Sequence, residues 1–94
     1  MNRLYIIILD PMVDTSIVRS RILDMDNFYV IYENQYLLIS EHNSAKDLYD
    51  VLTRNIPQTS GIVVLGVSRT DLTYWGYSSK GLWSWLKENV SETF

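Results

Sequence analysis

The sequence predicts a small α+β fold in which helices cover an antiparallel sheet. Residues 4–10, LYIIILD, form a short apolar run that is rich in β-branched residues and ends at Asp10-Pro11. This pattern is typical of a central strand covered on both faces. Residues 62–67, IVVLGV, form a second such run. Between the two runs, segments with helical spacing alternate with strand-like segments, as expected for an α+β protein.

Composition limits the possible classes of protein. The chain has 94 residues, which suffices for a single domain over residues 1–94, and its hydrophobic content of 47% excludes a disordered chain. Cysteine is absent, which excludes disulfides and is compatible with a cytoplasmic location. The apolar runs are too short for a secretory signal or a bilayer span, so no membrane association is expected. A net charge of −3, with scattered Lys and Arg, disfavours non-specific binding to nucleic acid.

The segment after Pro11 is predicted to form a helix and then a hairpin. Asp14 or Thr15 can cap a helix that runs to about Met25. Its apolar positions share one face and are Ile17, Val18, Ile22 and Met25. Residues 28–32 and 36–40 are rich in Tyr, Ile, Val and Leu, which predicts two strands joined by a short turn.

The strongest helix signal follows the hairpin. Ser44 and Asp47 have the spacing of a capping box, in which each side chain satisfies a backbone amide at the helix start. The predicted helix runs to about Asn55 and is ended by Pro57 and Gly61.

The last third of the chain holds one clear strand and a less clear aromatic segment. Residues 62–67 are predicted to be a second fully buried strand beside the first, in which Gly66 marks a bulge or a close approach of another backbone. Residues 71–77 fit either a short strand or an aromatic loop, and Ser78 or Ser79 can cap a final helix. The residues expected to point inward from that helix are Leu82, Trp85 and Leu86.

The predicted order of elements is strand, helix, strand, strand, helix, strand, which is the ferredoxin-like βαββαβ arrangement with a C-terminal aromatic extension. Right-handed crossovers would place the first two helices on one face of the antiparallel sheet. The opposite face then needs cover, either from the Trp-rich C-terminal segment or from a second subunit. We expect a homodimer whose interface includes the C-terminal segment.

This arrangement resembles the small bacterial proteins known as SinR-like, which are similar in fold to the CRISPR-associated Cas-two-type subunits. The likeness covers nearly the whole chain and rests on the Asp after the first strand, the overall pattern and the ending Trp85-Leu86-Lys87. The resemblance implies that Asp10 lies near its symmetry mate and binds Mg²⁺ or Mn²⁺ for phosphodiester cleavage. The chain departs from that pattern at Leu9 and Pro11, and it lacks the cluster of basic residues that follows.

Asp10 also has a simpler interpretation. An Asp before Pro commonly uses its side-chain oxygens to cap a loop, which needs no metal. The lone histidine, His42, has no evident partner for acid–base catalysis, so a structural role is expected. The sequence contains neither a nucleophile elbow nor a phosphate-binding loop, which excludes a hydrolase triad and disfavours nucleotide cofactors.

A dense aromatic group is the second candidate site. Tyr74, Trp75 and Tyr77 stand between two cations, Arg69 and Lys80. Aromatic rings beside cations can stack on bases or anchor a protein partner. Packing in the core or in a dimer is the structural alternative, and Trp75, next to a glycine, is the residue expected to be partly exposed.

We therefore expect a small cytoplasmic dimeric module, similar to Cas-two-type proteins, that acts mainly through protein association in a bacterial defence or toxin–antitoxin setting. The first alternative is an enzyme, a weak endonuclease that uses Mg²⁺ or Mn²⁺ at Asp10 on the dimer axis. The second alternative is a nucleic-acid-binding regulator that uses the aromatic group around Trp75.

Overall fold

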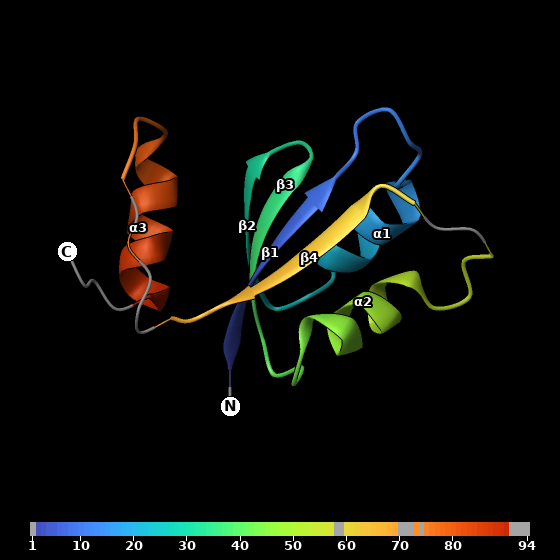
Figure 1. Cartoon of the computed structure of the whole chain (residues 1–94). Coiled ribbons are helices and arrows are strands. Elements are labelled where there is room, and N and C mark those ends of the chain that lie inside the picture. The colour runs from blue at the N-terminus through green and yellow to red at the C-terminus, as the bar shows by residue number, and fades with distance from the viewer. Residues whose placement is uncertain (1, 58–59, 70–72, 74, 91–94) are drawn as a thin grey trace.

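The computed structural model describes residues 2–57, 60–69, 73 and 75–90. Its elements in chain order are β1 (Arg3–Leu9), α1 (Ser16–Leu23), β2 (Asn27–Tyr32), β3 (Gln35–Ser40), α2 (Ala45–Thr53), β4 (Ile62–Val67) and α3 (Lys80–Asn89). The strands form one four-stranded antiparallel sheet in the order β2-β3-β1-β4 (Figure 1). The predicted α+β fold is confirmed, and so is the interior position of β1, which has a strand on either side.

Helices lie on both faces of this sheet. In Figure 1, α1 and α2 lie on one side of the strands and α3 lies on the other. The core under α1 and α2 contains alternate residues of β1, because successive side chains of a strand point to opposite faces. Its fully or nearly fully buried members are Tyr5, Ile7, Leu9, Val18, Ile22, Tyr36, Leu38, Leu48 and Leu52.

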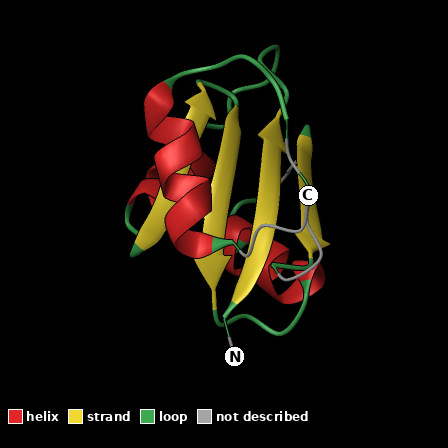
Figure 2. Ribbon diagram, turned by 90° about the vertical axis from the view of Figure 1, so that its left-hand side faces the viewer, coloured by secondary structure: helices red, strands yellow, loops and turns green. Residues whose placement is uncertain are grey.

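A second core lies under α3. Leu82 and Leu86 of α3 are buried in a cluster with Leu4 of β1 and Leu37 and Ile39 of β3. Figure 2 shows α3 in front of the sheet, and of the four strands β2 lies nearest to it. The C-terminal segment therefore provides cover for the opposite face, which is one of the two solutions that the sequence left open.

Hydrogen bonds fasten the C-terminal end of α3 to the sheet. The indole N–H of Trp85 donates to Asn27 Oδ1 of β2 at 3.0 Å, and the amide of Asn27 donates to Asn89 Oδ1 at 2.7 Å. Arg69, just after β4, donates through Nε to the backbone carbonyl of Asn89 at 2.7 Å. A cation on the last carbonyls of a helix also interacts favourably with the helix dipole.

The helix starts follow the predicted residues only in part. Ser44 Oγ accepts the backbone N–H of Asp47 at 3.1 Å, which is the Ser44 half of the predicted capping box. Thr15 occupies the N-cap position of α1 without a side-chain cap, while Asp14 accepts the N–H of Ser16 at 3.1 Å. The predicted helix ends, at Met25 and Asn55, are each two residues too long.

Two predictions for residues 62–67 are wrong. No bulge interrupts β4, whose register with β1 is continuous from Leu4↔Val67 to Leu9↔Ile62, and the ring of Tyr5 lies beside Gly66. The strand is not fully buried either, because it lies at the edge of the sheet. For residues 71–77, no strand or helix includes residues 73 and 75–77, whereas 71, 72 and 74 lie outside the described residues.

None of the helices in the described part of the chain has the length and apolar character needed to cross a bilayer.

Candidate functional site

Asp10 lies just after β1, and its carboxylate supports the turn that follows. Its Oδ1 accepts the backbone N–H of Met12 at 2.8 Å, and its own N–H donates to the carbonyl of Gly61 at 2.7 Å. Gly61 has a φ of 71°, and a Cβ placed there would stand only 2.6 Å from the Cβ of Asp10. Among the described residues, no three His, Cys, Asp or Glu side chains gather around a point where a metal ion could bind.

This geometry predicts how substitutions of Asp10 affect stability. We expect Asp10→Ala to lower the free energy of unfolding by about 0.5–1.5 kcal/mol, because the Met12 amide loses its acceptor. Asp10→Asn should behave like the natural protein, because the amide oxygen still accepts. Urea denaturation measures both variants. A rise in the unfolding midpoint with MgCl₂ that Asp10→Asn abolishes would contradict a role confined to the turn and support a metal site.

The structure separates the aromatic residues into two groups. Trp83 and Trp85 pack partly buried against the second core, whereas Trp75 and Tyr77 are almost completely exposed. The predicted exposure of Trp75 is confirmed. Tyr74, the other aromatic residue of the predicted contact patch, lies outside the described residues.

The two cations predicted to accompany the aromatic residues occupy different settings. Arg69 is bonded to the carbonyl of Asn89 at the end of α3, and Lys80 begins α3 at its opposite end. The ten residues of α3 therefore separate the two charges. Lys80 and Arg69 thus do not form one cationic patch.

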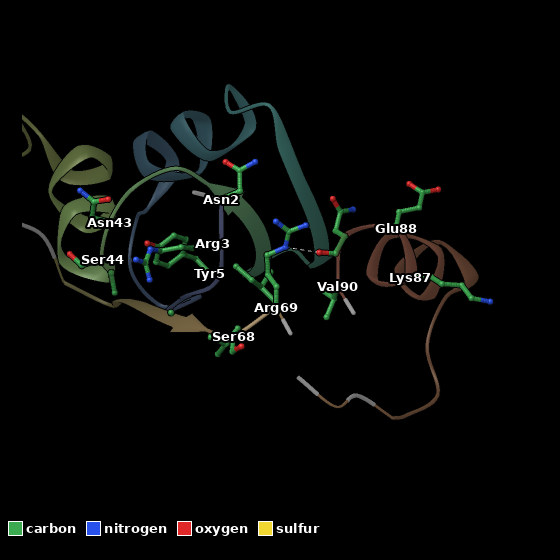
Figure 3. Close-up of a pocket in the computed structure, with 15 residues that line it drawn as sticks. Asn2, Arg3, Tyr5, Asn43, Ser44, Ser68, Arg69, Lys87, Glu88 and Val90 are labelled. Carbon is green, nitrogen blue, oxygen red and sulfur yellow. Dashed lines mark hydrogen bonds between the residues drawn. The ribbon is translucent and has the colours of Figure 1, made fainter. Parts of the chain in front are cut away.

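A cleft of about 1080 Å³ lies where β1 begins and β4 ends. Figure 3 shows Arg3 and Tyr5 on one side of it and Arg69 with Val90 on the other, while the Lys87 side chain extends away from Arg69. The cations on its walls are Arg3, Arg69 and Lys87. Glu88 adds one negative charge to the three positive charges, so the lining is net positive, although its cations do not converge on one point.

His42 lies just after β3 and is hydrogen-bonded to residues of β3 and β1. Its Nδ1 is hydrogen-bonded to Ser40 Oγ, and its carbonyl accepts the hydroxyl of Tyr5. Burial raises the pKa of Tyr5, because the phenolate would lose its hydration. These contacts tie the end of β3 to β1.

The sheet also carries an exposed apolar surface, which includes residues of the strand that the sequence predicted to be fully buried. Val63 and Leu65 of β4 are 47% and 46% exposed. They pair with Ile8 and Ile6 of β1, and directly paired residues share a face of the sheet. Ile6 packs against the second core, so this face is the one that carries α3. We call these four residues, Ile6, Ile8, Val63 and Leu65, the open face.

The backbone of β4 provides a second feature beside the open face. The hydrogen bond from the Asp10 N–H to the Gly61 carbonyl shows which residues of β4 direct their backbone N–H and C=O groups toward β1. Residues with this orientation alternate along an antiparallel pair. Residues Val63, Leu65 and Val67 turn their backbone groups toward β1. Those of Ile62, Val64 and Gly66 point away from the sheet, and we call this side of the strand the β4 edge.

Comparisons with known proteins do not place this chain in a family. No protein-family model, no curated protein and no solved structure matches it.

Proposed function

We propose that this chain is a ferredoxin-like association module whose partner is a second copy of itself. The observation that carries the proposal is the open face, where Val63 and Leu65 of β4 remain about half exposed beside Ile6 and Ile8. Contiguous apolar side chains on a protein surface commonly mark an interaction site.

The nature of β4 supports the same proposal. Exposed edge strands are usually protected by a charge, a proline or a bulge. β4 contains none of these, as its sequence is IVVLGV and its register with β1 is continuous. The other edge strand, β2, has an irregular register between Val30 and Tyr32, which makes it a poorer template for pairing.

The proposal includes a ferredoxin-like fold for this chain. The strand order β2-β3-β1-β4, with α1 and α2 on one face, supports a ferredoxin-like fold. This arrangement agrees with the resemblance to SinR-like and Cas-two-type proteins, in which dimers are expected. The contacts of Asp10 and the separation of Lys80 from Arg69 favour neither the nuclease nor the nucleic-acid regulator.

We predict that the natural protein is a dimer at micromolar concentration and that Leu65→Glu makes it a monomer. The new carboxylate would be desolvated in the interface without a partner, which we expect to weaken association at least about tenfold. Sedimentation equilibrium across a concentration series measures the change.

Ile17→Glu is the matched control. Ile17 is an exposed isoleucine on α1, outside the open face, so the same kind of substitution there should leave the dimer intact. A natural protein that remains monomeric throughout the micromolar range would reject the proposal. Equal weakening by both variants would also reject it, since the open face would then have no special role.

A further inference from the structure

We infer that two copies join through their β4 edges in antiparallel orientation, with Val64 of each copy at the two-fold axis. The two four-stranded sheets would then form one continuous sheet of eight strands. This inference rests on the proposed self-association and specifies its geometry.

The backbone selects Val64 as the centre. A two-fold axis perpendicular to an antiparallel pair passes between a residue and its own copy, so the register is symmetric about one residue. The outward residues are Ile62, Val64 and Gly66, as the bond between Asp10 and Gly61 requires. Centring on Val64 pairs Ile62 with Gly66 of the second copy and Val64 with itself. All three outward residues of each strand are then hydrogen-bonded.

The same register covers the exposed side chains. With Val64 at the centre, Val63 stands directly opposite Leu65 of the second copy, and Leu65 stands opposite its Val63. These are non-hydrogen-bonded pairs, in which side chains approach most closely. Both residues are about half exposed in the single chain, so pairing removes apolar surface from water.

Charge supports the antiparallel orientation and a second copy as the partner. The cleft where β4 ends is lined by Arg3, Arg69 and Lys87 and by one carboxylate, Glu88, whereas Asp10 lies beside Gly61 where β4 begins. In the antiparallel pair, the end of each β4 that precedes Arg69 lies opposite the end of the other β4 beside Asp10, which stands one strand back, after β1. Unlike charges near an interface favour the correct orientation, with a strength that falls as salt increases.

This register separates the two Asp10 side chains. Gly61, next to Asp10, lies opposite Val67 of the second copy, so the two Gly61 residues are six positions apart along the paired strands. At about 3.4 Å per residue, that is about 20 Å. The edge-paired dimer therefore does not bring two Asp10 carboxylates to one metal ion.

Cysteine cross-linking tests the register, because the natural chain contains no cysteine. The variants Val63→Cys and Leu65→Cys are oxidised separately and as an equal mixture. Opposed residues in a non-hydrogen-bonded pair have Cα atoms about 4.5 Å apart, which suits a disulfide. In a dimer of two copies of the same variant, the two cysteines are diagonal neighbours about 7–8 Å apart. This distance is too long for a disulfide.

We expect disulfide-linked dimers only in the mixture, in about half of all dimers, because the two variants pair at random. Efficient cross-linking of Val63→Cys or Leu65→Cys alone would overturn the Val64-centred register. If sedimentation shows a dimer but no sample cross-links, edge pairing is wrong while the proposed self-association stands. If the natural protein is a monomer, the proposed function and this inference both fail.

Discussion

Ile7→Ala is expected to lower the free energy of unfolding by about 2–5 kcal/mol, because it leaves a cavity at the centre of the first core. Ile7 has no exposed surface, and it pairs with Tyr36 on one side and Val64 on the other. For a domain of this size, each 1 kcal/mol corresponds to about 4–8 °C in Tm. Urea denaturation and thermal melting both measure the loss.

Ile8→Ala is the matched control, since it removes the same atoms one residue further along the same strand. Ile8 is only partly buried, on the open face, so we expect a loss of about 1 kcal/mol or less at protein concentrations below dimerisation. If the two variants lose equal stability, β1 is not covered more tightly on the side of α1 and α2. The comparison therefore tests which face of the sheet is closed.

Sequence patterns predicted the elements well because their signals are local. The Ile-rich run of β1 and the stripe of α2 after Ser44 each occupy a few consecutive residues, and both elements are present in the structure. The final helix carries its buried residues at the predicted positions Leu82 and Leu86. Helix ends were less accurate, since the last turn depends on packing as well as on sequence.

The same patterns did not reveal that β4 is an edge strand. The apolar run of residues 62–67 resembles that of β1, but β1 has two neighbouring strands and β4 has one. A continuous apolar run indicates that both faces of a strand are more stable when they are buried. It does not indicate which element buries them. In β4 we attribute the excess of apolar residues to the proposed dimer, which would bury Val63 and Leu65.

The sequence also did not predict in full which of the tryptophans are buried and which are exposed. Trp75, Trp83 and Trp85 lie within eleven residues, and no periodicity extends across them. Trp85 follows the inward face of α3 and reaches Asn27, whereas Trp75 precedes the helix and is exposed. The sequence predicted the exposure of Trp75 from the adjacent glycine, but it could not show that Arg69 would bind the end of α3.

Leu86→Asp is expected to release α3 from the sheet and to lower the free energy of unfolding by about 3–5 kcal/mol. Leu86 is 4% exposed in the second core, where a carboxylate would be buried among apolar side chains. A helix of ten residues is not stable alone in water, so the released segment should lose its helical structure. Far-ultraviolet circular dichroism should show less helix, and tryptophan emission should shift to longer wavelength as Trp85 enters water.

Ser84→Asp is the control for charge on the same helix, because Ser84 is exposed and its substitution should change stability by no more than about 0.5 kcal/mol. The first core shares no side chain with the second, so the sheet, α1 and α2 should remain folded in Leu86→Asp. Leu37 and Ile39 would then lie uncovered beside the open face, and we expect stronger self-association or aggregation as a result. Unchanged helical content and tryptophan emission in Leu86→Asp would mean that the second core does not hold α3.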